Sequence, residues 1–156
     1  MSRTAMASLT VGICVLVVLA STRRAPADDG CTNAALRGSY AVEASGTLLS
    51  GPLAGPTALV GVFSYDGFGQ VSGHITQRVT TATGPTTLTD VPLAGTYSVN
   101  ADCSAQDSLT NLSNGSISVH EYSIADNGRR FNILNTTAGP TVVLGTGIRQ
   151  FGGGHD

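Results

Sequence analysis

Glu121 is the side chain whose neighbours best place it for acid–base chemistry. It lies in "GSISVHEYSI", where polar and apolar residues alternate as they do on the two faces of a β-strand. Glu121 shares a face with Ile117 and Val119, and a carboxylate on an apolar face is desolvated unless it is paired. The pattern leaves two alternatives: a Glu121 inside the fold, or a Glu121 that faces solvent or an arginine.

Glu43 and two histidines are the other side chains able to transfer protons. Glu43, in "GSYAVEASG", is a second candidate carboxylate. His120 takes the strand face opposite to Glu121, so only one of these two side chains can point inward. His74 lies opposite an apolar face and is expected in solvent. The sequence contains no G-x-S-x-G, H-E-x-x-H, P-loop or dinucleotide-binding motif, so whether the protein is an enzyme stays open.

Cys31 and Cys103 are predicted to form a disulfide that closes a loop of about 70 residues. A metal site is the alternative use of two cysteines. The sequence has no C-x-x-C, no H-x-H and no histidine beside either cysteine. We therefore expect no metal and no cofactor.

The N-terminus has a short basic start and then an apolar run, a pattern typical of a secretory signal peptide. We expect it to cover residues 1–27, with cleavage after Ala27 or, alternatively, after Ala20. Residues 28–156 then form a single domain with ten acidic residues and five arginines, a net charge of −5. This charge disfavours nucleic acid, and no later apolar run is long enough to insert into a membrane. The expected location is secreted or periplasmic.

Residues 28–156 are predicted to be all-β, and a repeated phrase suggests how the strands are arranged. Asp66–Gly69 and Asp126–Gly128 supply turns between alternating runs. "LRGSYAV" returns as "LAGTYSV", and each is followed by an aromatic strand, a turn and a return strand, which indicates two similar four-strand halves. Eight strands favour an antiparallel up-and-down barrel, because closure removes exposed sheet edges. A β-sandwich is the alternative.

Aromatic side chains are the candidates for lining a ligand cavity in such a barrel. The alternative for each is a position in a packed core. The candidates are Tyr40, Phe63, Tyr65, Tyr97 and Phe131.

The motifs "GSY", "FSYDGFG" and "GTYSVNADC" together resemble a group of small exported bacterial β-barrel proteins of unassigned function. The architecture that this resemblance implies is similar to calycin-like barrels and to the allene oxide cyclase and dirigent barrels. Lipocalins usually carry a G-x-W motif near their first strand, and this chain has no tryptophan.

Three functions follow from these observations. We expect the barrel to bind a small apolar molecule without catalysis. The first alternative is a cyclase or isomerase of the allene-oxide-cyclase type, with Glu121 or Glu43 acting inside the cavity. The second is a structural or interaction protein with a filled core. The sequence specifies neither the ligand nor the oligomeric state.

Overall fold

Eight β-strands make up most of the described chain, which comprises residues 30–138 and 141–150 of this computed structural model. The predicted signal peptide lies outside these residues. No helix among them is long and apolar enough to cross a membrane. The elements are η1 (Asn33–Leu36), β1 (Gly38–Leu48), β2 (Gly55–Tyr65), β3 (Gln70–Thr81), β4 (Gly84–Val99), β5 (Ser104–Asn111), β6 (Ile117–Ala125), η2 (Asp126–Gly128), β7 (Arg130–Asn135) and β8 (Thr141–Arg149).

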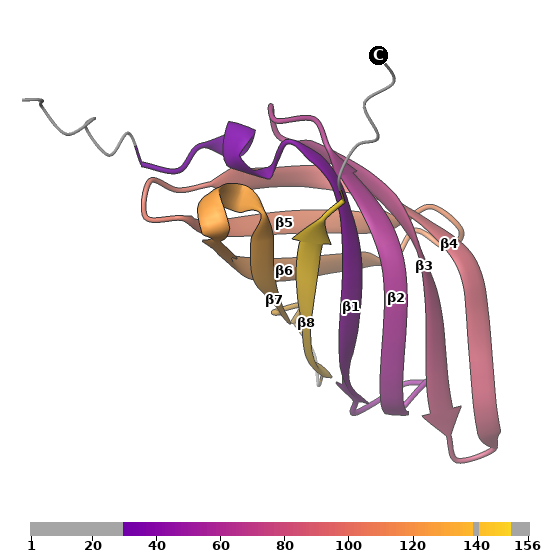
Figure 1. The fold of residues 1–156 in the computed structure, drawn as a ribbon. Coiled ribbons are helices and arrows are strands. Elements are labelled where there is room, and N and C mark those ends of the chain that lie inside the picture. The colour runs from indigo at the N-terminus through magenta and orange to yellow at the C-terminus, as the bar shows by residue number, and fades with distance from the viewer. Residues whose placement is uncertain (1–29, 139–140, 151–156) are drawn as a thin grey trace, which may run out of the picture.

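The strands form a closed antiparallel barrel in chain order (Figure 1). Each strand pairs with the next, and β1 also pairs with β8, which closes the sheet. The up-and-down barrel predicted from the sequence is confirmed, and the closure excludes the sandwich. The predicted turn at Asp66 is also present, because its Oδ1 accepts backbone N–H bonds from Phe68, Gly69 and Gln70 at 2.7–3.0 Å.

The repeated phrase does not mark equivalent strands of two four-strand halves. "LRGSYAV" leads into β1, whereas "LAGTYSV" lies near the end of β4, so the two phrases run in opposite directions along the barrel. Tyr40 stands opposite Phe63 on the neighbouring strand, but Tyr97 and Tyr122 lie on β4 and β6, with β5 between them. The phrases share a position instead. Both place a tyrosine at the same end of the barrel, where β1 begins and β4 ends.

Aromatic side chains fill the end of the barrel that carries η1 and η2, which we call the closed end. Neighbouring rings have centroids 5.0–6.1 Å apart and mostly meet edge to face, an arrangement that favours aromatic packing. Leu36 of η1 is fully buried in the same core. The rings belong to Tyr40, Tyr65, Tyr97, Tyr122 and Phe131.

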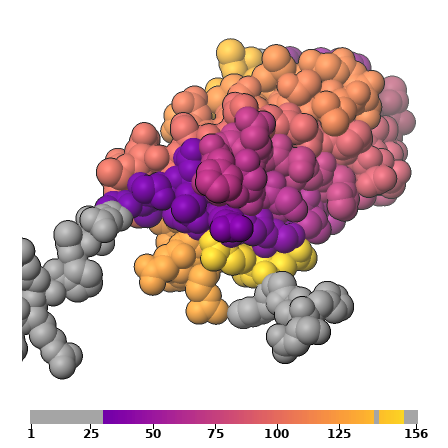
Figure 2. Space-filling view, turned by 90° about the horizontal axis from the view of Figure 1, so that it is seen from above, coloured from indigo at the N-terminus to yellow at the C-terminus, as the bar shows by residue number. Residues whose placement is uncertain are grey.

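The segment before β1 lies across the closed end and is tied to β4. The Tyr97 hydroxyl donates to the Asn33 carbonyl at 3.0 Å, and the Val99 N–H donates to Asn33 Oδ1 at 2.8 Å. Cys31 and Cys103 lie at disulfide distance, as predicted, with their Cα atoms 4.9 Å apart. Figure 2 shows the indigo N-terminal part of the described chain against the magenta part, and Arg37 lies against Gly67 of the β2–β3 turn there.

Glycine at inward-facing strand positions lets the barrel bend around its core. A Cβ at Gly147 would overlap the ring of Phe131, which is fully buried. A Cβ at Gly95 would overlap the backbone carbonyl of Ser108 on β5. Close approach of a ring or a neighbouring strand is the physical reason for glycine in a strand.

Candidate ligand-binding cavity

The barrel interior beyond the aromatic layer holds a cavity of about 430 Å³. Ser116 and Ile117 line this cavity and are also exposed, so it reaches the surface at the end opposite η1, which we call the open end. Most of the wall is apolar, because inward-facing strand positions recur every second residue and carry apolar side chains. Besides Ile117, the aliphatic lining residues are Val42, Ala44, Leu48, Leu59, Ile75, Leu93, Leu109, Ile133 and Val143.

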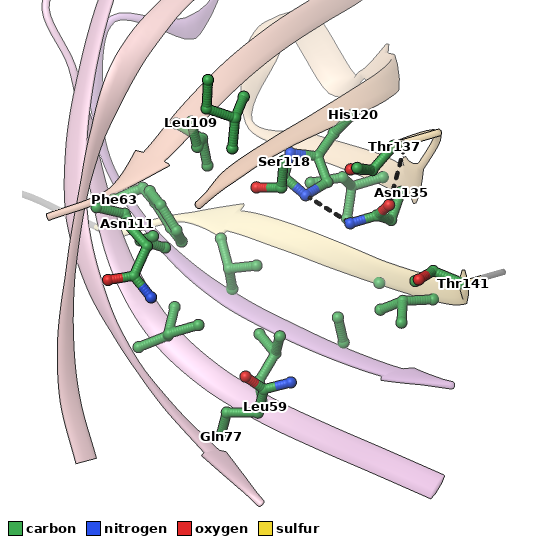
Figure 3. Close-up of a pocket in the computed structure, with 18 of the residues that line it drawn as sticks. Leu59, Phe63, Gln77, Leu109, Asn111, Ser118, His120, Asn135, Thr137 and Thr141 are labelled. Atoms are coloured by element: carbon green, nitrogen blue, oxygen red, sulfur yellow. Dashed lines mark hydrogen bonds between the residues drawn. The ribbon is translucent and has the colours of Figure 1, made fainter. Parts of the chain in front are cut away.

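A row of polar side chains runs from β5 to β7 on one side of the cavity. Asp107 on β5 pairs with His120 on β6, and His120 pairs with Asn135 on β7. His120 Nδ1 lies 2.7 Å from Asp107 Oδ1, and Asn135 Nδ2 lies 3.2 Å from His120 Nε2. His120 and Asn135 line the cavity, and Figure 3 shows them together on one side, away from Leu59 and Gln77. We call Asp107, His120 and Asn135 the polar row.

Hydrogen-bond chemistry sets the direction of each bond in the polar row. The Thr137 N–H donates to Asn135 Oδ1 at 3.0 Å, so the amide nitrogen of Asn135 faces His120. An amide nitrogen can only donate, so His120 Nε2 accepts and the imidazole proton lies on Nδ1. Nδ1–H then donates to the carboxylate of Asp107, which is 2 % exposed. The geometry thus holds His120 in its neutral Nδ1–H tautomer at the cavity wall.

Two tyrosines connect the polar row to the aromatic layer. The Tyr122 hydroxyl donates to Asp107 Oδ2, and the Tyr65 hydroxyl lies 3.3 Å from that of Tyr122. Because Tyr122 gives its proton to Asp107, Tyr65 is the donor to Tyr122. Burial raises the pKa of Tyr65 and of Tyr122, and the neighbouring phenol and the Asp107 carboxylate raise that of Tyr122 further. Asp107 therefore accepts two hydrogen bonds from neutral donors.

The two carboxylates proposed from the sequence lie outside the barrel. Glu121 and Glu43 are exposed on β6 and β1, and neither lines the cavity. The inward orientation considered for Glu121 is wrong, because the face of β6 that carries His120 and Tyr122 points inward. Tyr122 decides this orientation, since its ring packs 5.0 Å from that of Phe131.

The aromatic candidates divide between the cavity and the closed end. Phe63, Tyr65 and Phe131 line the cavity. Tyr40 is instead held in the closed end, where its hydroxyl accepts hydrogen bonds from Arg149 at 2.8 and 3.0 Å and donates to the Gly128 carbonyl. Tyr97 contacts Asn33 at the same end. His74 is exposed, as expected.

Asp107 and Asn135 are the members of the polar row that the sequence analysis missed, and only Asp107 had a clear signal. Asp107 lies on the same face of β5 as Ala105 and Leu109, both buried, so an acidic residue on an apolar strand face was the available signal. The pairing with His120 could not be read from the sequence, because it depends on the β5–β6 register.

Metal-ligand geometry is not found in the described part of the chain. No three His, Cys, Asp or Glu side chains gather there closely enough to hold an ion. His120 meets one carboxylate only, and the remaining neighbours of the polar row are amide and phenol groups.

Comparison with known proteins yields barrels of low sequence identity. A redesigned β-barrel matches with a TM-score of 0.50 and 14 % identity over 76 % of this chain and 95 % of its own. A second redesigned β-barrel, mFAP1, whose structure is bound to DFHBI, matches with a TM-score of 0.48 and 18 % identity over 75 % of this chain and 97 % of its own. The first match shows a shared barrel fold and nothing further. No family model and no curated protein matches the chain.

Proposed function

We propose that this is an exported binding protein that holds a small, mainly apolar molecule inside its barrel. The observation that carries the proposal is the cavity of about 430 Å³, whose wall is mostly apolar and carries the polar row on one side. Small-molecule sites combine apolar walls with a few placed polar groups. A signal-like N-terminus and the Cys31–Cys103 disulfide support export to an oxidising compartment.

The size of the cavity favours a binding function over a structural protein with a filled core. Protein interiors pack densely, with few voids larger than a water molecule, and an unfilled cavity lowers stability. In this barrel, the small inward residues Ala44 and Gly145 line the space instead of large side chains that could close it. A molecule that enters the cavity would restore the missing contacts with the aliphatic wall.

A neutral, environment-sensitive dye such as N-phenylnaphthylamine tests this proposal. Its fluorescence is expected to rise saturably with the unaltered protein. Ala44→Phe places a ring in the cavity and should weaken dye binding by about tenfold or more. Ala41→Phe makes the same change at an exposed position of β1 and should leave binding unchanged.

Two outcomes would contradict a binding cavity. One is a dye that binds both phenylalanine variants as it binds the original protein, which would place the dye outside the barrel. The other is the absence of saturable binding to a protein shown to be folded by circular dichroism.

The Asp107–His120 pair favours proton transfer as a second candidate function. A carboxylate that accepts from Nδ1–H orients an imidazole and leaves its Nε2 as the basic nitrogen, as a general base requires. When Asn135 donates to a bound carbonyl instead of to Nε2, that nitrogen is free to take a proton from the adjacent carbon. The proton moves from carbon to Nε2, and the electron pair of the broken C–H bond forms an enolate.

Hydrogen–deuterium exchange in decan-2-one, followed by NMR in heavy water, tests this second function. The protein should accelerate exchange at the carbons beside the carbonyl, and His120→Gln should abolish the acceleration. Glu121→Gln, on the outer face of the same strand, should retain it. Equal exchange with and without protein would exclude the reaction for this class of ketone.

A further inference from the structure

We infer that the cavity selects an uncharged ligand, with an apolar body and one hydroxyl or carbonyl group bound at Asn135 and Ser118, and discriminates against the carboxylate of the same shape. This inference rests on the proposed binding function and specifies its ligand class. It follows from three features of the cavity. No arginine or lysine is among its described lining residues, the Asp107 carboxylate lies behind the polar row, and free hydrogen-bond donors lie at the wall.

A ligand anion finds no positive partner among the described residues of the cavity. None of the lining residues is an arginine, and the chain has no lysine. Arg149 is engaged at the closed end, where it donates to Tyr40 and, at 2.6 Å, to the Ala35 carbonyl. Arg78 donates to Thr87 at an exposed site. A carboxylate that enters the cavity would lose its hydration and gain no counterion, which is costly in an apolar environment.

Asp107 places a negative charge directly behind the polar row. Its side chain is fully buried, and its two oxygens accept from His120 and Tyr122. A ligand carboxylate at Asn135 would be separated from this charge by one neutral imidazole, in surroundings where charges repel strongly. An ammonium group would be attracted by this charge, but it cannot reach the Asp107 oxygens behind His120 and Tyr122, and it would lose its hydration in an apolar environment.

A neutral oxygen does find partners at the same wall. Asn135 Nδ2 carries two hydrogens, and one of them is directed at His120 Nε2. The second has no acceptor among the described residues. The Ser118 hydroxyl also lines the cavity and makes no hydrogen bond within the described chain. A hydroxyl or carbonyl oxygen can accept from Asn135 and Ser118, while the rest of the ligand contacts the aliphatic wall.

Decanol, decanoate and decylamine test the inference, because they share one chain and differ in head-group charge at neutral pH. Each is titrated by calorimetry, below its micelle concentration, into the unaltered protein, so the comparison does not depend on a variant that has to fold. Decanol should bind at least about tenfold more tightly than either ion, the discrimination expected from an uncompensated desolvated charge.

Two leucine variants on β7 locate the head group. Asn135→Leu preserves the side-chain shape and removes the donor, so the affinity for decanol should fall by about fivefold while that for N-phenylnaphthylamine is unchanged. Asn132→Leu makes the same change at an exposed position and should alter neither affinity.

The outcomes separate this inference from the function on which it rests. Equal or tighter binding of decanoate or decylamine overturns the charge selectivity but leaves a binding cavity. Unchanged decanol affinity in the Asn135→Leu variant overturns the placement of the head group. If neither the dye nor any of the three ligands binds, both the inference and the proposed function are wrong.

Discussion

At the residue scale, Asp107 is the acceptor that holds the polar row together. It receives hydrogen bonds from His120 and Tyr122 while buried inside the barrel. In Asp107→Asn, the amide nitrogen faces one of these two donors, so a buried bond is lost. We expect the free energy of unfolding in urea to fall by about 1–3 kcal/mol. Glu121→Gln, an exposed carboxylate, should change it by less than about 0.5 kcal/mol. Equal stability of the two variants would contradict the role of Asp107.

The tyrosines give a second prediction at this scale. All four have a raised pKa, with burial as the first cause. In the unfolded chain the tyrosines ionise at about pH 10. Above that pH the unfolded state has lost protons that the folded state retains. Stability should therefore be complete below about pH 10 and decline as the pH rises further. Ultraviolet absorbance should show tyrosinate forming together with unfolding. A phenol that titrates normally in the folded protein would contradict this burial.

At the element scale, much of the barrel could be predicted from the sequence, but which face of β6 points inward could not. Alternation and turn residues predict strands and hairpins, and the strand number predicts closure. One face of β6 carries Ile117 and Val119, and the other carries Tyr122 and Ile124. The two faces are therefore similarly apolar. The structure resolves this choice through the contact of Tyr122 with Phe131 on β7 and its bond to Asp107 on β5, both made between neighbouring strands. Strand pairing, which local pattern does not encode, therefore determined which acid–base residue faces inward.

Gly147 gives the prediction for the strands. Gly147→Ala places a methyl group inside the ring of Phe131, so either the ring or β8 must move. Overpacking of this kind should lower the free energy of unfolding by about 1–3 kcal/mol, measured in urea. Ser98→Ala, at an exposed position of β4, is the control and should have little effect. A Gly147→Ala protein as stable as the control would show that the close contact is not required.

At the scale of the whole molecule, the disulfide ties the N-terminal segment to the β4–β5 turn across 72 residues of chain. The double variant Cys31→Ser with Cys103→Ser should lower the free energy of unfolding by about 4 kcal/mol in the chain-entropy treatment. Reductant should shift the urea midpoint of the original protein in the same direction and leave that of the double variant unchanged. A midpoint insensitive to reductant in the original protein would contradict a stabilising bridge.

The most direct test of the binding cavity is methyl NMR during a decanol titration, because neighbouring residues report on opposite faces of the barrel. Leu59 and Val143 line the cavity, whereas Val60 and Val142 are 59 % and 54 % exposed on the outer surface. Binding in the cavity predicts saturable shifts of the Leu59 and Val143 methyl signals, with those of Val60 and Val142 nearly unmoved. Shifts confined to Val60 and Val142, or none at all, would contradict a ligand site inside the barrel.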